Sequence, residues 1–343
     1  MRILCIDKHE TNAGWGAECF LGEALEAAGV SPRHLDYERH RGRVAAALQA
    51  EPAFRDVDAV LVQRGTGYVF PPRVLDAFRV PRILLLTELV TRARALEPLL
   101  RSGRFEHVFV RTPACAAALV ERGWVPADAV DVFLSACPEP YLREGATPPE
   151  EDAKDIDVLW VGSVLPRRRR ILDELARTVP VTEAAAFGAE MVALVRRARV
   201  VLNLHAEERL DTETRVYEVL GAGGFLLSEP LSAESPFEPG RHYVESASPS
   251  ALGQQVRACL ADPERRNTIA AAGHAEVRAR HTYAARAAQV LAALQTLSKT
   301  RPPGRNAVDL GTLQAAAVHE HKRARQAALL APLRRAAARL RGR

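Results

Sequence analysis

Several side chains between residues 200 and 230 have the chemistry to bind a ligand with phosphates and hydroxyls. This stretch contains an imidazole at His205, a guanidinium at Arg215 and a carboxylate at Glu218, followed by a glycine-rich turn at 221–224. Guanidinium and exposed N–H groups bind phosphate, whereas a carboxylate accepts hydrogen bonds from hydroxyls. We therefore expect one crevice that holds both kinds of group.

The apolar pattern predicts the elements that position these side chains. Residues 200–204 form an apolar run with β-branched residues, which is typical of a strand buried on both faces. The Asp-Thr pair at 211–212 can cap a helix over 215–220, and 225–227 is the next predicted strand. Ligands of open α/β sheets bind beyond the carboxyl ends of the strands, so His205 is expected at the site.

Four consecutive arginines, 167–170, follow the predicted strand 157–162 and lead into the predicted helix 171–177. Arginine is unfavourable at a helix start, because the helix macrodipole is positive there. A phosphate bound at that helix end would remove the conflict. The alternative is a solvated basic turn, since clustered arginines often lie on the surface without a ligand.

The first half of the chain alternates strands with helices. Apolar runs predict strands at 2–6, 57–63, 82–86, 107–110 and 130–133, and helical spacing predicts helices at 17–28 and 114–122. Strands that alternate with helices indicate a parallel, doubly wound sheet. The loop with Gly14 and Gly16 opens like a dinucleotide-binding turn, but Cys19 replaces the third glycine, which argues against a dinucleotide.

Polar side chains that follow two of these strands are candidates for a catalytic base. His9 and Glu10 come after the first strand, and Glu88 comes after the strand 82–86. A carboxylate directly after an apolar run needs solvent or a partner, so Glu88 is the more notable acid. The alternative for each residue is a helix cap or a solvated loop position.

The same segments resemble the two-domain GT-B glycosyltransferases. The motifs in chain order are NLH (203–205), DTETRVYE (211–218), GAGGFLLS (221–228), FEPGRHYV (237–244), DPERR (262–266), AAAGH (270–274) and RHTYAAR (280–286). They are most similar to glycosyl transferases group 1 of the spore-maturation-type (CgeB-like) subgroup. The resemblance covers 155–295 well and the first half more loosely.

The resemblance implies an α/β fold of two Rossmann-like domains that face each other across a cleft. It implies that Glu218 accepts hydrogen bonds from a ribose and that Arg168 or Arg169 contacts a phosphate. The residues expected to bind the donor are Gly162, Ser163, Arg168, Arg169, Arg215, Tyr217, Glu218, Gly221, Gly223 and Gly224. The residues expected to help hold the acceptor are Gly14, Trp15 and Gly16.

The chain departs from many retaining relatives at one position. Those relatives carry Glu-x7-Glu, but Leu210 stands eight residues before Glu218, while His205 matches the histidine of the spore-maturation-type pattern. Retaining and inverting transfer therefore both stay open. The candidate catalytic residues are His205, Glu88, His9 and Glu10, with capping of backbone groups as the alternative for His205.

No metal or other cofactor is expected. Enzymes without a bound metal stabilise a diphosphate leaving group with arginine or lysine and with helix N-termini, and those are the groups found here. His319 and His321 are two residues apart, so they do not share a helical face. The cysteines lack metal-type spacing and are expected to be reduced thiols, mostly in the core: Cys5, Cys19, Cys115, Cys137 and Cys259.

Length and charge divide the chain into three regions. With 343 residues, 48% of them hydrophobic, the chain is long enough for two domains, expected at 1–150 and 151–298, followed by a basic tail at 299–343. The tail holds eleven Lys/Arg and two Asp/Glu, a net charge of +9, and the remaining residues carry −4. The basic character belongs to the tail, so we expect no nucleic-acid binding by the body.

The tail permits three interpretations. Residues 310–343 combine arginines with apolar residues, as in a helix that contacts an anionic membrane surface. The alternatives are a disordered basic tail and a helix that packs on the body. Because the sequence has no apolar leader and no membrane-spanning run, we expect a cytoplasmic protein, peripheral at the inner face of the membrane if the tail binds lipid.

Together these observations predict a hexosyltransferase-type enzyme that moves a sugar from a nucleotide-sugar donor to an acceptor without a metal. The alternative is a GT-B-like protein without turnover, which acts as a binding or scaffold subunit through a membrane- or partner-binding tail. The sugar, the nucleotide, the acceptor and the oligomeric state are left open by the sequence.

Overall fold

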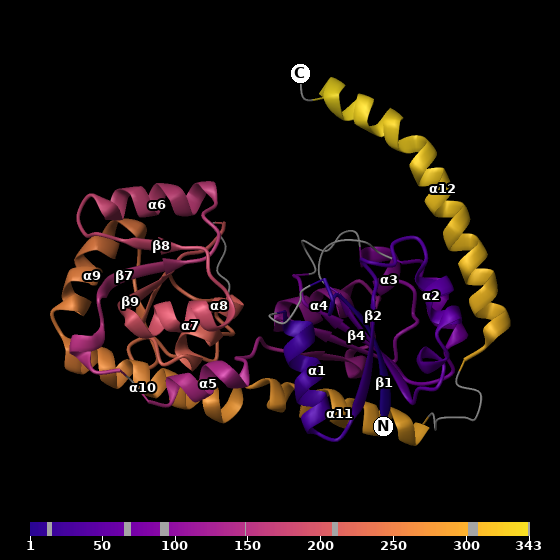
Figure 1. Cartoon of the computed structure of the whole chain (residues 1–343), viewed down its shortest axis with the longest axis horizontal. Coiled ribbons are helices and arrows are strands. Elements are labelled where there is room, and N and C mark those ends of the chain that lie inside the picture. Colours follow the sequence, from indigo (N-terminus) through magenta and orange to yellow (C-terminus); the bar gives the residue numbers. More distant parts are fainter. Residues whose placement is uncertain are drawn as a thin grey trace. The chain divides into compact units, whose positions relative to one another are not determined.

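The computed structural model describes residues 1–11, 16–64, 70–89, 96–147, 149–207, 212–300 and 308–341 (Figure 1). The chain forms two compact units: unit 1 comprises Met1–Phe133 and Ala287–Arg343, and unit 2 comprises Leu134–Arg286. These bounds differ from the expected 1–150, 151–298 and 299–343. The reason is that the chain leaves unit 1 directly after its last strand, and the C-terminal helices return to it.

Unit 1 is organised around a parallel six-stranded sheet with the order β2-β1-β3-β4-β5-β6. The strands are β1 (Arg2–Asp7), β2 (Ser31–Asp36), β3 (Ala59–Arg64), β4 (Arg82–Leu86), β5 (His107–Val110) and β6 (Val130–Val132). The five predicted strands are confirmed with bounds that differ by at most two residues. Strand β2 was not predicted, because its sequence lacks an apolar run. As an edge strand it has one neighbour and tolerates Pro32.

The helices of unit 1 cover a large apolar core. They are α1 (Ala17–Ala27), α2 (Val44–Ala50), α3 (Glu97–Leu100), α4 (Pro113–Glu121) and α12 (Leu310–Arg341), with short 3-10 helices η1 (Pro52–Phe54), η2 (Pro72–Ala77) and η4 (Ala127–Ala129). Leu48 of α2 and Val74 of η2 share this core with Leu4 and Ile6 of β1. Helix α11 (Tyr283–Thr300) carries the chain from unit 2 back into unit 1.

The start of the predicted tail packs against unit 1. Leu313 and Ala316 of α12 are buried in the unit-1 core. The Glu320 carboxylate is also buried, and its Oε2 accepts a hydrogen bond of 2.9 Å from the N–H of Ala45 in the first turn of α2. Of the three interpretations of the tail, packing on the body therefore holds for this first part of α12. Pro332 lies within the helix and does not end it.

Unit 2 contains a parallel five-stranded sheet with the order β11-β10-β9-β7-β8. The strands are β7 (Ile156–Val161), β8 (Thr182–Ala184), β9 (Ala198–Asn203), β10 (Leu226–Ser228) and β11 (Val244–Glu245). The predicted strands at 157–162, 200–204 and 225–227 are confirmed with shifts of one or two residues. Strands β7 and β9 are almost wholly buried, as their apolar runs indicated.

Helices cover both faces of the unit-2 sheet. They are α5 (Glu139–Gly145), α6 (Pro166–Ala176), α7 (Gly188–Arg197), α8 (Thr214–Gly221), α9 (Leu252–Leu260) and α10 (Pro263–Arg280), with 3-10 helices η5 (Glu151–Ala153) and η6 (Pro249–Ala251). Helices α6 and α9 pack with Trp160 and Leu202 on one face, and α5, α7 and α8 pack with Leu159 and Val201 on the other. Figure 1 shows α6 and α7 on opposite sides of the strands.

Two expectations about the chain as a whole are met by the described residues. All five cysteines are buried and unpaired with one another. In the described part of the chain, the helices are too short or too polar to span a lipid bilayer.

Replacing Glu320 with alanine is expected to destabilise the protein by about 1–3 kcal/mol, because the buried Ala45 N–H loses its acceptor. The measurement is the midpoint of urea unfolding. The control is His321→Ala, which removes an exposed side chain from the next position of the same helix. Equal midpoints for the two variants would contradict the packing of α12 on α2.

Candidate functional site

The carboxyl edge of the unit-2 sheet has the topology of a ligand site. From β7 the chain continues through α6 to β8 on one side, whereas from β9 it continues through α8 to β10 on the other side. Helices α6 and α8 lie on opposite faces of the sheet, so the loops after β7 and β9 diverge. At such a switch point, ligands of open parallel sheets bind beyond the strand ends, so this is the place of the expected crevice.

Arg168 lies across this switch point. Its Nε donates to the Leu204 carbonyl after β9 at 2.8 Å, and its Nη1 donates to the Ser163 carbonyl after β7 at 3.3 Å. Its Nη2 lies 2.9 Å from the Glu213 carboxylate, directly before α8. The guanidinium also stands over the Trp160 ring, 5.1 Å from its centroid. Arg168 thus connects the turn after β7 with the end of β9 and the start of α8.

Arg167 forms a second polar network at the same edge. It donates to both carboxylate oxygens of Glu229, at 2.9 and 2.6 Å, and to the His205 carbonyl at 3.0 Å. Glu229 also accepts a hydrogen bond of 2.7 Å from the His205 N–H. Burial alone would raise the pKa of Glu229, but the hydrogen bonds from Arg167 and His205 lower it. The loop after β9 is therefore fixed to the end of β10.

The His205 ring has one engaged nitrogen and one unpartnered nitrogen. Its Nε2 lies 2.7 Å from the Pro230 carbonyl, so we assign the proton to Nε2. Its Nδ1 is buried and has no hydrogen-bond partner among the described residues, while the residue as a whole is 3% exposed. Among the described residues, Nδ1 therefore keeps an unused lone pair in the interior.

Arg169 is positioned differently from its two neighbours. Its side chain is 44% exposed, and it pairs with Glu183 at 2.6 Å and with Asp173 at 3.1 Å. Arginines 167, 168 and 169 therefore each have a carboxylate partner in this structure. The sequence left two interpretations of these arginines open, a phosphate site and a solvated basic turn. Arg168 is buried, as the first interpretation requires, whereas Arg169 is exposed, as in the second.

Glu218 and Arg215 lie together on α8. Their side chains are 3.5 Å apart, and both are largely buried. Burial raises the pKa of the Glu218 carboxyl above its usual value, and Arg215 opposes the shift. Burial and the nearby Glu218 carboxylate also raise the pKa of Tyr141 in α5 to about 12.

Gly162 and Ser163 form the turn after β7 at the same edge. Gly162 has a φ of 137°, which favours glycine, and its N–H donates to the Ala184 carbonyl at 2.9 Å. Ser163 is exposed, and its carbonyl accepts from Arg168. These two residues therefore lie where the sequence predicted them, at the start of the crevice.

The glycine turn 221–224 lies at the opposite end of the sheet from the crevice, which corrects the prediction for Gly221, Gly223 and Gly224. Helix α8 starts at the carboxyl edge and ends at the amino edge, because it connects two parallel strands. The N–H groups of Gly223 and Gly224 donate to the carbonyls of Leu220 and Val219, as in a Schellman helix end. These N–H groups are therefore used by the helix and do not form a phosphate site.

Close packing explains why glycine occurs in this turn. Gly223 has a φ of 75°, and a Cβ there would lie 2.9 Å from the Gly145 carbonyl oxygen. A Cβ on Gly221 would overlap the Cys137 sulfur. The glycines thus allow α8 to end against α5.

Two further predictions around α8 are corrected. Tyr217 is 1% exposed and packs edge-on against Phe237, with ring centroids 5.0 Å apart, so it belongs to the core and not to the donor site. The Thr212 hydroxyl bonds to Ser232 at 2.8 Å instead of capping the helix, and the N-cap residue is Glu213. The other predicted cap, Asp211, lies outside the described residues.

The candidate catalytic residues of unit 1 are engaged in local contacts. The His9 ring stacks on His34 with centroids 3.9 Å apart, and the His9 N–H donates to Asp7 at 3.0 Å. Glu10 forms an ion pair with Arg39. Of the predicted acceptor residues, Gly16 is the N-cap of α1, whereas Gly14 and Trp15 lie outside the described residues.

Glu88 follows β4 and bonds to its own neighbour. Its Oε1 accepts a hydrogen bond of 2.8 Å from the N–H of Leu89. One carboxylate oxygen of Glu88 thus accepts a hydrogen bond from the adjacent backbone, which is a local contact of the kind that the alternative interpretation expected. It leaves the catalytic role of Glu88 a prediction.

One cluster of metal-type ligands occurs among the described residues. The ligand atoms of Cys5, Asp7 and His34 lie within 4.8 Å of one another. However, the His34 Nδ1 is 2.7 Å from the Asp7 carboxylate, and burial followed by the Asp7 charge raises the pKa of the Cys5 thiol well above its usual value. The cluster therefore presents a hydrogen-bonded pair beside a protonated thiol.

The sequence also contains two Asp-x-Asp triplets, at 56–58 and 155–157, the spacing that is often found in metal-binding transferases. Both triplets lie at the amino ends of strands, β3 and β7, and not at the carboxyl edges. Arg2 pairs with both aspartates of the first triplet, and Arg197 and Arg199 pair with those of the second. These acids therefore act in ion pairs in this structure.

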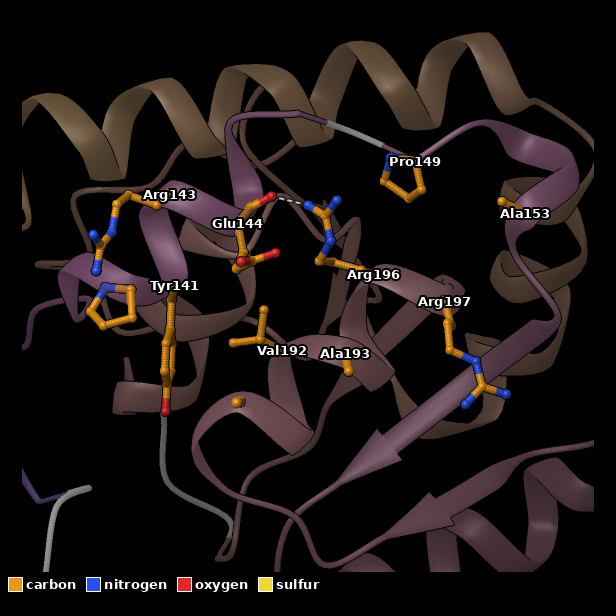
Figure 2. A pocket seen from close by; sticks show the side chains of 11 residues that line it. Tyr141, Arg143, Glu144, Pro149, Ala153, Val192, Ala193, Arg196 and Arg197 are labelled. Carbon is orange, nitrogen blue, oxygen red and sulfur yellow. Dashed lines mark hydrogen bonds between the residues drawn. The ribbon is translucent and has the colours of Figure 1, made fainter.

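A pocket of about 650 Å³ lies between α5 and α7, outside the crevice (Figure 2). Its wall is mainly apolar, with Val192 and Ala193 at its centre. Arg196 donates to the carbonyls of Glu144 and Thr147, and Arg197 pairs with Asp155. These arginines hold the end of α5 and the following segment against α7, which is a structural role.

Sequence reasoning missed two residues at the carboxyl edge, Glu213 and Glu229, which are the partners of the arginines. Phe187 lies in a segment that the sequence suggested for the base of a nucleotide, and it is 48% exposed and directly precedes α7. Glu229 could have been found from its place after a predicted strand. The pairing of Glu213 with Arg168 spans 45 residues and has no local sequence signal.

Comparisons with known proteins agree with this geometry. Residues 152–292 match a family model described as glycosyl transferase-like. This match covers unit 2 from residue 152 onward and contains Arg168, His205, Glu213 and Glu218. No sequence match to a curated protein was found.

Several solved structures share the fold of most of the chain. The Anabaena protein Alr3699/HepE, in complex with UDP-glucose, is 15% identical and covers 87% of this chain and 100% of its own, with a TM-score of 0.60. The sucrose-phosphate synthase from Thermosynechococcus elongatus is 16% identical and covers 88% of this chain and 100% of its own, with a TM-score of 0.57. The UDP-forming trehalose-phosphate synthase from Burkholderia vietnamiensis is 13% identical and covers 89% of this chain and 99% of its own, with a TM-score of 0.60. The expected GT-B fold, with two Rossmann-like α/β units, is thereby confirmed.

Replacing Glu218 with glutamine is expected to raise the melting temperature at pH 7. The folded-state pKa of Glu218 lies above its unfolded value, so the ionised carboxylate lowers stability at neutral pH. The gain should disappear as the pH falls below the unfolded pKa of about 4.3, where both states are protonated. Thermal denaturation at pH 7 and pH 4 measures this, with the exposed Glu190→Gln as the control. A gain that is equal at both pH values would contradict the burial of an ionised Glu218.

Proposed function

We propose that the protein is a glycosyltransferase of the hexosyltransferase type, which moves a sugar from a nucleotide-sugar donor to an acceptor. The observation that carries this proposal is the buried guanidinium of Arg168, fixed across the switch point of the second sheet in a GT-B fold. Support comes from the glycosyl transferase-like match over 152–292 and from fold neighbours solved with UDP and UDP-glucose.

The donor would bind at the carboxyl edge of unit 2. Arg168 would contact the diphosphate, because guanidinium groups form paired hydrogen bonds with phosphate oxygens. Glu218 would accept hydrogen bonds from the ribose hydroxyls, one turn into α8. The exposed ring of Phe187 offers a surface on which a base can stack.

The transfer step would use positive charge from the protein. As the glycosidic bond breaks, negative charge grows on the diphosphate leaving group, and a preorganised guanidinium stabilises it. Arg168 is held in place before the ligand arrives, so no reorganisation of its side chain is needed. We therefore propose transfer without a bound divalent metal.

His205 would orient the sugar end of the donor. Its Nδ1 accepts a hydrogen bond, since Nε2 carries the proton and faces the Pro230 carbonyl. This role is positional, and it fits either retaining or inverting transfer. The membership of the spore-maturation-type subgroup and the catalytic roles of His9, Glu10 and Glu88 stay predictions.

The first test is a thermal-shift screen with UDP, GDP, dTDP, CDP and their sugars, with and without EDTA. A ligand that binds only the folded state raises the melting temperature, and the rise should not change with EDTA. Glu218→Ala should weaken binding of the selected nucleotide by about 1–3 kcal/mol through lost hydrogen bonds to the ribose. The control is Glu190→Ala, an exposed acid on α7.

Two results would change the proposal. A shift that EDTA abolishes would replace metal-independent transfer with a metal-dependent one. The absence of a shift with every nucleotide would favour the binding or scaffold protein without turnover. Sugar transfer to a panel of acceptors, followed by mass spectrometry of the products, separates turnover from binding alone.

We also propose that the end of α12 contacts an anionic membrane surface. Residues 321–343 contain eight Lys/Arg and no Asp/Glu, whereas Glu320 and the residues before it pack on unit 1. Removing 327–343 should leave the melting temperature unchanged and abolish binding to vesicles with phosphatidylserine, while vesicles of neutral lipid bind neither form. Vesicle binding that survives the truncation would refute the role of this segment.

A further inference from the structure

Arg168 has a single charged partner in the described part of the chain, and that partner is Glu213. The Arg168 Nε and Nη1 bind two backbone carbonyls, so Nη2 is the nitrogen that remains for an anion. Both carboxylate oxygens of Glu213 contact this nitrogen, at 2.9 and 3.1 Å. The chain's own carboxylate therefore occupies the position where an anion can bind Arg168.

The two members of this ion pair are held very differently. The Arg168 side chain is 9% exposed and is anchored by the Leu204 and Ser163 carbonyls, which a ligand does not need to displace. The Glu213 side chain is 30% exposed and makes no capping hydrogen bond to its own helix, α8. Glu213 can therefore turn toward solvent, whereas Arg168 stays in place.

We propose that Glu213 holds the place of the donor phosphate and leaves Arg168 when the diphosphate binds. This inference rests on the proposed function, because it takes the diphosphate of a nucleotide sugar as the ligand of Arg168. Two anions on one guanidinium nitrogen repel each other strongly in a partly buried site. The diphosphate carries more charge than the carboxylate and forms charge-assisted hydrogen bonds with the guanidinium, so it displaces the carboxylate.

The exchange of Glu213 for a diphosphate would give Arg168 a negatively charged partner both without and with a ligand. Without a ligand, Glu213 neutralises a buried cation that would otherwise lack a counter-charge. When a ligand binds, the Arg168–Glu213 ion pair breaks, which costs free energy. Only a ligand group with comparable or greater negative charge offsets that cost. Glu213 thereby makes the site selective for a diphosphate over an uncharged nucleoside.

The test compares Glu213→Gln with the wild-type protein by isothermal titration calorimetry at low ionic strength. The glutamine keeps the size of the side chain and removes its charge. Binding of UDP should become about tenfold tighter, which corresponds to about 1.4 kcal/mol, because no carboxylate competes for Arg168. Binding of uridine should not change. The melting temperature without ligand should fall, since Arg168 loses its counter-charge, and UDP should restore it.

Two matched variants separate this effect from a change in net charge. Glu174→Gln removes an exposed acid from α6 that has no role in the pair, and UDP affinity should stay at the wild-type value. Glu183→Gln removes one of the two carboxylate partners of Arg169, the other predicted phosphate ligand, and should also leave UDP affinity unchanged. If Glu183→Gln tightens UDP binding and Glu213→Gln does not, Arg169 is the phosphate ligand and the inference is wrong.

The outcomes distinguish this inference from the proposed function. If the wild-type protein binds UDP and Glu213→Gln binds it equally or more weakly, the inference is overturned and the proposed function stands. If neither protein binds UDP, GDP, dTDP, CDP or inorganic pyrophosphate, both are overturned. Should Glu213→Gln fail to fold, Glu213→Asp keeps the charge on a shorter side chain and should still tighten UDP binding, by a smaller factor.

Discussion

The carboxyl edge of the second sheet depends on one buried charge. Strands β7 and β9 end side by side, and beyond them lie the carbonyls of Ser163 and of the fully buried Leu204, which need donors. Arg168 supplies these hydrogen bonds, but its charge then requires a partner, which Glu213 provides from the start of α8. The positions of the β7 turn, the β9 loop and the first turn of α8 all follow from this arrangement.

The direction of α8 decides which of its residues can meet a ligand. A helix between two parallel strands runs back across the sheet, so its first turn lies at the ligand edge and its last turn lies at the other edge. Arg215 and Glu218 are near the start, and the glycines are at the end. The residues of this motif therefore have different roles. Those at the start of α8 lie at the ligand edge, whereas the glycines at its end pack against α5.

Much of the fold was readable from the sequence, because buried strands such as β4, β5 and β9 are short apolar runs and their bounds follow from composition. The edge strand β2 was missed, since a strand with one neighbour needs no apolar run. The arginines and Glu218 were proposed for the site from local patterns and from the family resemblance, but the partners of the arginines were not, because the pairing of Arg167 with Glu229 exists only after folding. The glycine turn was wrongly assigned to the donor site, because glycines are typical both of helix ends and of loops that bind phosphate.

The discontinuity of unit 1 has a consequence for how the protein is made. The apolar surface of α2 and η2 is covered by Leu313 and Ala316, which are synthesised after the whole of unit 2. Unit 2 is one uninterrupted segment, so its whole sequence is available earlier than that of unit 1. Synthesis from the N-terminus therefore completes the second unit first, and the nascent first unit keeps an open hydrophobic face until Leu313 and Ala316 have emerged.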